Sequence, residues 1–160
     1  MRAVALALTK AILPTYAVPS VWVEKAPIPS GQWRQNFAQS TLADGTVLIT
    51  AGQSPAGIGT LVNSYDPLTN AWTSKAPMPS GRFHHSQSTL SNGTVLVTGG
   101  YLGSGNSNSS PATTEVRCYD PAANAWTTKA SLLVGVSYQA QCTLSDGTAL
   151  VTGGLASNAV

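Results

Sequence analysis

The chain has 160 residues, of which only 9% are charged, and its formal net charge is +2 at pH 7. This length is sufficient to bury a core of its own. So few charges provide no basic patch for neutralising phosphates, so nucleic acid is not an expected partner. Ser, Thr, Asn, Gln and Gly supply most of the polarity, a balance common in extracellular β-proteins. This favours an extracellular or cell-surface location without deciding it.

The first twenty residues contain a short apolar run that Lys10 ends. The run is too short to span a bilayer, and Lys10 interrupts what would be the core of a signal peptide. The interpretations that stay open are a signal peptide, a disordered leader, and a degenerate third strand in residues 11–18. We assign residues 1–11 to a leader of uncertain structure and residues 12–160 to a repeat domain.

One phrase occurs three times with little change: ADGTVLITAG, SNGTVLVTGG and SDGTALVTGG, which start at residues 43, 91 and 145. Each copy begins with Asp-Gly or Asn-Gly, which predicts a two-residue type I′ hairpin turn. Each turn is followed by an almost continuously apolar, β-branched run, which predicts an interior strand covered on both faces. Each run then ends at Ala-Gly or Gly-Gly.

A longer unit surrounds this phrase, because Tyr-Asp-Pro followed by Asn-Ala-Trp occurs at Tyr65 and again at Tyr119. The tryptophans Trp22, Trp72 and Trp126 lie 50 and 54 positions apart. Repeats at this period are typical of propellers and solenoids. We interpret the unit as a four-stranded antiparallel meander, with its tyrosine in the third strand and its tryptophan packed between neighbouring sheets.

The double glycine, the tyrosine and the tryptophan at these spacings resemble the kelch repeat. The middle copy, with Arg82 and His85 ahead of its turn, resembles kelch repeats of bacterial multi-repeat proteins and, more distantly, the propeller of galactose oxidase. The resemblance implies an all-β fold: a kelch-type β-propeller segment of about three four-stranded antiparallel blades, incomplete as a single chain. The expected repeat units are about residues 22–71, 72–125 and 126–160.

Closed propellers have four to eight blades, so three blades do not close a ring. Either a longer chain supplies further blades or two copies form a six-bladed homodimer, with strands three and four of one copy completing strands one and two of the other. The structural positions implied by the resemblance are Trp22, Trp72, Trp126, Gly99, Gly100, Gly153, Gly154, Tyr65 and Tyr119.

The variable connections share one face of such a meander, and binding residues concentrate on loops of this kind. This loop face comprises residues 25–36, 53–61, 75–85, 101–114 and 129–139. We expect its binding residues to be Arg82, His84, His85 and Tyr101. Stacking by Trp33 or Tyr138 is an alternative to their packing within blades.

The interpretation is a non-catalytic module that binds protein or glycan on the loop face. The alternatives are a purely structural propeller fragment and a copper oxidase related to galactose oxidase, although no match to that family's tyrosine-histidine pair or thioether cysteine is present. Adjacent histidines in a strand point to opposite faces, so they form a poor metal site. No catalytic residue, metal or cofactor is expected. Cys118 and Cys142 are interpreted as small buried hydrophobes, with a disulfide as the alternative.

Overall fold

The computed structural model describes residues 5–9, 21–29, 34–103 and 111–157, and every regular element within them is a β-strand. Two sheets have four strands each. Blade A has the order β3-β4-β7-β8, with β3 Ala38–Thr41, β4 Val47–Thr50, β7 Val62–Asp66 and β8 Ala71–Lys75. Blade B has the order β10-β11-β13-β14, with β10 Ser86–Thr89, β11 Val95–Thr98, β13 Val116–Asp120 and β14 Ala125–Lys129. All their pairings are antiparallel, which confirms the meander predicted from the repeats.

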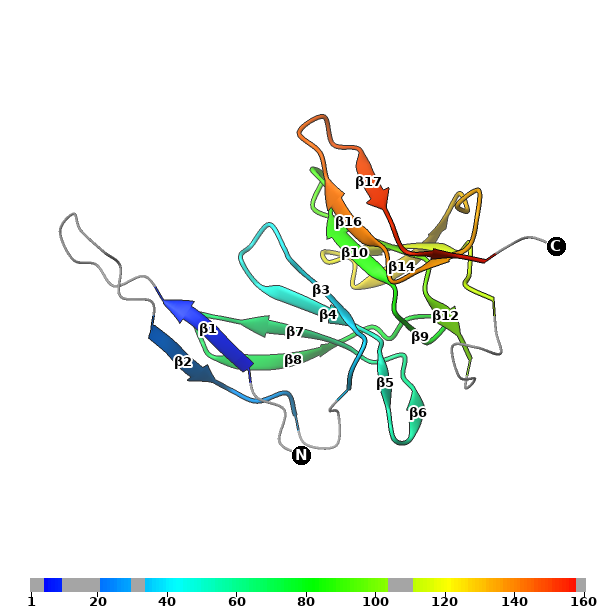
Figure 1. Ribbon diagram of the computed structural model, residues 1–160. Coiled ribbons are helices and arrows are strands. Elements are labelled where there is room, and N and C mark those ends of the chain that lie inside the picture. The colour runs from blue at the N-terminus through cyan, green and yellow to red at the C-terminus, as the bar shows by residue number, and fades with distance from the viewer. Residues whose placement is uncertain (1–4, 10–20, 30–33, 104–110, 158–160) are drawn as a thin grey trace.

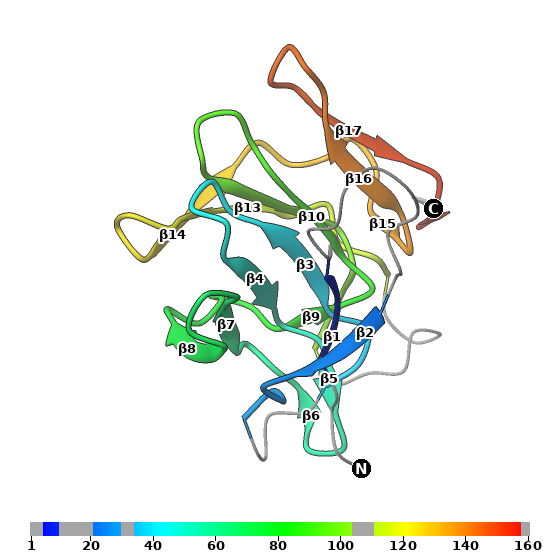
Figure 2. The same ribbon diagram turned by 90° about the vertical axis from the view of Figure 1, so that its left-hand side faces the viewer.

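Two hairpins flank the blades. The N-terminal half-blade pairs β1 Ala5–Thr9 with β2 Val21–Lys25, and the C-terminal half-blade pairs β16 Ala140–Thr143 with β17 Ala149–Thr152. Figures 1 and 2 show the sheets following one another along an arc, with the two half-blades at its ends. The innermost strands β3, β10 and β16 are neighbours across the blades. The all-β propeller segment is therefore confirmed, and its described part forms an open arc.

The strand that pairs with β2 lies earlier than the sequence suggested. One interpretation placed this strand in residues 11–18, but β2 pairs with Ala5–Thr9, within the stretch assigned to a leader. Residues 11–18 lie outside the described residues. The assignment of β2 as a fourth strand does not change. Within the described residues, no helix is long and apolar enough to cross a membrane.

The three repeated hairpin turns differ from the predicted type I′ turn. A type I′ turn needs positive φ at both central residues. Here the glycines Gly45, Gly93 and Gly147 have φ between 83° and 85°, while the preceding Asp or Asn does not have positive φ. In the first turn Gly45 N–H donates to Leu42 O, which gives a three-residue loop that ends in a glycine bulge. The carboxylate of Asp44 accepts from the N–H and hydroxyl of Thr46, and these bonds fix its conformation.

The main core lies between blades A and B. It contains Leu42, Leu48, Ala51, Val62 and Met78 from blade A, and Val95, Val97 and Tyr119 from blade B, with Trp126 packed against it. Leu48 of β4 and Val95 and Val97 of β11 are fully buried, which confirms the prediction of interior strands for the first two copies. The third copy differs, because Leu150 of β17 is 43% exposed in the described arc. The interface between blades, rather than the interior of one blade, therefore holds the apolar residues together.

A polar ladder also joins the innermost strands β10 and β16 to the blades that precede them. Gln87 Nε2 donates to Leu48 O at 3.1 Å and Ser40 Oγ at 3.0 Å, and its Oε1 accepts from Thr50 Oγ1 at 2.5 Å. Gln141 repeats these contacts one blade later, with Leu96 O, Ser88 Oγ and Thr98 Oγ1. The repeated glutamine of the first strand is thus an inter-blade contact.

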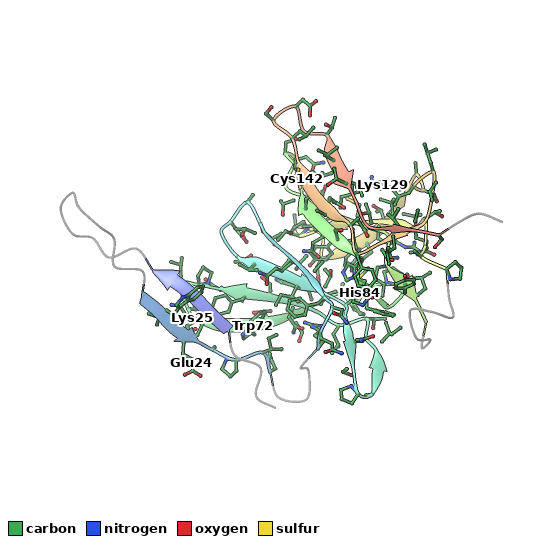
Figure 3. The ribbon with its side chains drawn as sticks, viewed as in Figure 1. Glu24, Lys25, Trp72, His84, Lys129 and Cys142 are labelled. Carbon is green, nitrogen blue, oxygen red and sulfur yellow. The ribbon has the colours of Figure 1, made fainter. Side chains whose placement is uncertain are left out.

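An outer contact joins the blades at their fourth strands. Trp72 Nε1 donates to Ala26 O at 2.8 Å, and Asn70 Oδ1 accepts from Ala26 N–H at 2.9 Å. Trp126 and Asn124 hold Ala76 in the same way, at 2.9 and 2.8 Å. Figure 3 shows Trp72 close to β2, whose end it secures. Because Ala26 follows β2 as Ala76 follows β8, β2 has the position of a fourth strand.

Candidate functional site

A second layer of short strands builds the loop face. β9 Arg82–Phe83 pairs with β12 Tyr101–Leu102, and β15 Val136–Ser137 pairs with β18 Leu155–Ala156. In blade A an isolated bridge joins the equivalent Gln35 and Gln53, and β5 Gln53–Ser54 pairs with β6 Gly57–Ile58. In each repeat the chain entering the innermost strand therefore pairs with the segment that follows the second strand. This pairing holds the loop face on a rigid base.

The residues that enter the innermost strands form a backbone chain across this face. Asn36, His84 and Tyr138 have φ of 56°, 54° and 59°. His84 N–H donates to Asn36 O at 3.0 Å, and Tyr138 N–H donates to His84 O at 2.9 Å. A left-handed conformation costs a non-glycine residue roughly 1–2 kcal/mol. Such strain is concentrated at functional positions, which draws attention to the side chains of these residues.

The side chains of His84 and Tyr138 stack with their ring centroids 3.7 Å apart and an interplanar angle of 27°. Tyr101 meets both rings edge-on, at 6.3 Å from His84 and 6.2 Å from Tyr138, and Phe83 lies 5.4 Å from Tyr101. Figure 3 shows His84 where the blades meet. Tyr138 is 49% exposed, His84 is half-buried, and Tyr101 and Phe83 are buried. We name His84, Tyr138, Tyr101 and Phe83 the aromatic cluster.

Burial lowers the pKa of His84 below its usual value. The imidazole is therefore neutral at pH 7, and the exposed part of the aromatic cluster carries no charge. It offers π faces together with the hydrogen-bonding groups of Tyr138 and His84.

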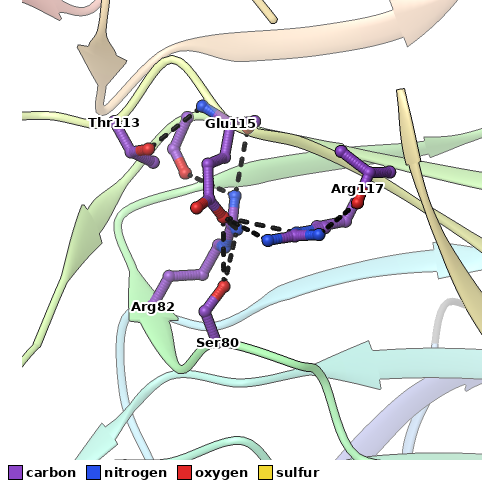
Figure 4. A network of polar contacts seen from close by, with 7 residues as sticks. Ser80, Arg82, Thr113, Glu115 and Arg117 are labelled. Atoms are coloured by element: carbon purple, nitrogen blue, oxygen red, sulfur yellow. Dashed lines mark hydrogen bonds and ion pairs between the residues drawn. The ribbon is translucent and has the colours of Figure 1, made fainter. Parts of the chain in front are cut away.

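Arg82 does not reach the surface, contrary to its expected role as a binding residue. Its side chain is fully buried and forms an ion pair with Glu115 at 2.9 Å. It also donates to Gly99 O, Glu115 O and Ser80 Oγ. Glu115 in turn pairs with Arg117 at 3.0 Å, and Figure 4 shows this network. Burial lowers the pKa of Arg82 to about 10, so it remains cationic and holds the loop-face base together.

Arg34 of blade A is the counterpart of Arg82, and it was not among the binding residues expected from the sequence. It donates to Leu61 O at 2.7 Å and to Asn63 Oδ1 at 2.5 Å, and these residues match Glu115 and Arg117 in the next repeat. The first repeat has two extra residues before this position, so counting from the tryptophan obscured the match. An arginine therefore occupies this position in blades A and B, whereas Val136 occupies it in the third repeat.

His85 is also buried, so it is not available for ligand contact. Its Nε2 lies 2.9 Å from Thr50 Oγ1, and its Nδ1 has no hydrogen-bond partner among the described residues. Burial, with the nearby charge of Arg82, lowers the pKa of His85 to about 3. Gln139 takes this position in the next repeat and donates to Thr98 O. His85 therefore links two blades as a neutral side chain.

The residues assigned structural positions lie at repeat contacts. Tyr65 and Tyr119 donate to Asn70 Oδ1 and Asn124 Oδ1, beside the rings of Trp72 and Trp126. Trp22 differs from the other two tryptophans, because it is 65% exposed. The glycines have positive φ: Gly99 62°, Gly100 86°, Gly153 66° and Gly154 87°. A Cβ on Gly100 would lie 2.7 Å from Phe83 O, so only glycine fits there.

Both cysteines are free, which overturns the disulfide alternative. Cys118 is buried as expected. Cys142 is exposed, because no further sheet covers β16 in the described arc. Among the described residues there is no group of three or more His, Cys, Asp and Glu side chains that could hold a metal ion.

Comparison with known proteins identifies the repeats. The sequence is 34% identical to Kelch-like protein 25 of Xenopus tropicalis over 118 residues, which is 72% of this chain and 20% of the relative. It is 35% identical to Kelch-like protein 25 of Xenopus laevis over the same length and shares. No protein-family model matches the chain. The chain spans about one fifth of the length of these relatives.

The similarity and the four-stranded antiparallel sheets define the class of this protein: a β-propeller segment built from repeated blades. The chain belongs to the kelch-repeat proteins.

Proposed function

We propose that this chain is a non-catalytic module that binds a protein partner on the loop face, with the stacked rings of His84 and Tyr138 at the centre of the contact. The observation that carries the proposal is Tyr138, which is half exposed although its ring stacks on a neighbouring blade. Buried aromatics need no partner, whereas an exposed and rigid aromatic gains from being covered. Tyrosine is enriched among the residues that contribute most to protein interfaces.

The backbone supports this assignment. Hydrogen bonds from His84 N–H to Asn36 O and from Tyr138 N–H to His84 O fix the spacing of the two residues. The strand pairs β9–β12 and β15–β18 also fix the residues that directly precede His84 and Tyr138. A preorganised contact loses little conformational entropy on binding.

The chemistry of the surface indicates what the partner presents. Arg82 is buried, and its charge is compensated by Glu115. His84 is neutral because burial lowers its pKa. An uncharged π surface fits an aromatic or apolar side chain of a partner peptide, with a backbone carbonyl to accept from the tyrosine hydroxyl.

The test is selection of binding peptides from a displayed random library, followed by affinity measurements on purified variants. We expect Tyr138→Ala to weaken the selected peptides at least tenfold, because it removes the exposed ring. Leu68→Ala is the matched control, since Leu68 is 93% exposed in the β7–β8 turn at the other end of the blade. Peptides that respond to Leu68→Ala and not to Tyr138→Ala would contradict the proposal.

Two further measurements distinguish a protein partner from the glycan and copper oxidase alternatives. Binding on a glycan array that Tyr138→Ala abolishes, with no peptide selected, would overturn a protein partner in favour of a glycan. Stoichiometric binding in a copper titration would contradict the non-catalytic assignment and favour the oxidase alternative.

A further inference from the structure

Blades A and B show which contacts a complete neighbour supplies. In each case the innermost strand donates from a glutamine to the preceding second strand, as Gln87 does to Leu48 O. The fourth strand donates from a tryptophan to the alanine that ends the preceding blade, as Trp126 does to Ala76 O. These two repeated contacts describe the surface that each open end of the arc lacks.

Among the described residues, the C-terminal half-blade presents the inner two strands of a blade. β17 pairs only with β16 among the described strands, whereas β4 and β11 each pair on both sides. Leu150 is 43% exposed, although Leu48 at the same position in blade A is fully buried. Ala130 follows β14 as Ala76 follows β8, and no hydrogen bond to Ala130 occurs among the described residues.

The N-terminal half-blade presents the outer two strands of a blade within the described part of the chain. β1 spans five residues, as β7 and β13 do. Leu8 pairs with Trp22 in the register in which Tyr65 pairs with Trp72. Trp22 is 65% exposed. Gln39 is exposed as well, and its side chain makes no hydrogen bond within the described part of the chain.

We propose that two copies of this chain complete each other's half-blades, β17 of one copy pairing with β1 of the other, to form a six-bladed ring with two-fold symmetry. The register of β4 with β7 and of β11 with β13 places Ala149 opposite Leu8 and Thr152 opposite Ala5 of the partner copy. Trp22 then donates to Ala130 O across the interface, and Gln39 donates to Leu150 O. Six blades fall within the range of closed propellers.

The two ends match because, in the described arc, they present opposite halves of the same unit. Each copy therefore uses its own two ends on its partner's two ends, which is the closed arrangement that two-fold symmetry produces. Closure covers Trp22 and Leu150, and removal of apolar surface from water contributes roughly 25 cal/mol for each Å². It also pairs the free edges of β1 and β17, which otherwise promote aggregation. This interface is separate from the aromatic cluster, so it is independent of the proposed function.

The first test is sedimentation equilibrium of the purified chain over a range of concentrations. We expect a species of twice 16.4 kDa that Leu150→Lys converts to a monomer. Leu68→Lys is the matched control, because it introduces the same charge at an exposed leucine away from both ends. A chain that sediments as a monomer at every concentration, or as an open series of oligomers, overturns the proposal.

The second test places a cysteine opposite Cys142 of the partner copy. Ser40 Oγ lies 3.1 Å from Thr89 Oγ1, and Ser88 Oγ lies 3.0 Å from Thr143 Oγ1, in successive blades. Cys142 occupies the serine position of the third repeat, so the partner's Thr41 takes the threonine position across the interface. We expect Thr41→Cys to form an intermolecular disulfide with Cys142 under mild oxidation. The additional substitution Cys142→Ser should abolish this disulfide. Thr73→Cys, on the exposed side of β8, is the control and should form none.

A dimer without this disulfide would overturn the proposed pairing. The alternative is that further blades of a longer native chain cover the same ends, and it can be distinguished from closure by a second copy. The full-length protein would then be a monomer in which Cys142 resists iodoacetamide, and this result would contradict closure by a second copy.

Discussion

Substitution of Gln87 by alanine tests whether the polar ladder stabilises the contact between blades. Gln87 is buried and forms three hydrogen bonds to blade A, with Leu48 O, Ser40 Oγ and Thr50 Oγ1. Each contributes about 0.5–1.5 kcal/mol net, so we expect Gln87→Ala to lower the free energy of unfolding by about 2–4 kcal/mol. Thr50 keeps its contact with His85 Nε2, which holds the loss below the upper limit.

The assay is urea unfolding followed by tryptophan fluorescence, with the slope of each transition compared with wild type. Gln35→Ala is the matched control, because the Gln35 side chain is exposed and makes no side-chain hydrogen bond among the described residues; we expect it to change stability by less than about 0.5 kcal/mol. A Gln87→Ala protein as stable as Gln35→Ala would refute the role of the ladder. A double-mutant cycle with Thr50→Val should return a coupling of about 1 kcal/mol if the two side chains bond directly.

Three further predictions follow from individual side chains. Gly100→Ala should destabilise the fold by more than about 2 kcal/mol, because its Cβ would meet Phe83 O at 2.7 Å. Gly93→Ala has no atom within 4 Å of its Cβ and should cost only about 1 kcal/mol of backbone strain, so thermal melts should show a larger loss of stability for Gly100→Ala. The pKa of His85 is lowered to about 3 in the folded state, so the unfolded chain binds a proton at higher pH than the folded chain, and stability should fall as the pH drops from about 6.5 towards 3. The difference between the urea midpoints at pH 7 and pH 4.5 should be smaller in His85→Gln than in wild type. An unchanged difference would contradict the assignment. Trp126→Phe should lose about 1 kcal/mol with the hydrogen bond to Ala76 O, and an unchanged urea midpoint would show that this contact is not stabilising.

The fold was predictable because each repeat carries the contacts that join it to its neighbour. The tyrosine, asparagine and tryptophan of one unit hold the alanine that ends the preceding unit, so their spacing follows the blade period. The second strands β4 and β11 were recognisable because both of their faces are covered, and a covered strand has a nearly continuous apolar sequence.

The turn geometry was predicted wrongly for a local reason. Asp-Gly and Asn-Gly favour a type I′ turn in isolation, but here the side chain of Asp44 accepts two hydrogen bonds from Thr46. Only Gly45 then needs positive φ, and the loop has three residues. The Thr that follows each glycine was the signal for this alternative.

The candidate site was harder to predict, because burial is not visible in a polar segment. Arg82, His84 and His85 are close in sequence, yet Arg82 and His85 face the blade interior and only His84 is partly exposed. Tyr138 lies 54 positions after His84 and meets it because both enter innermost strands of successive blades. The positive φ of both residues depends on the tertiary structure, so the stack could not be derived from composition or spacing alone.

Hydrogen–deuterium exchange of the chain, with and without a selected peptide, tests the interaction surface most directly. The proposed function predicts slower exchange in residues 82–84, 101–102 and 136–138, which bring His84, Tyr101 and Tyr138 together on the loop face. Protection confined to the hairpin turns at residues 44–45, 92–93 and 146–147 would place the peptide at the opposite end of the blades and contradict the account.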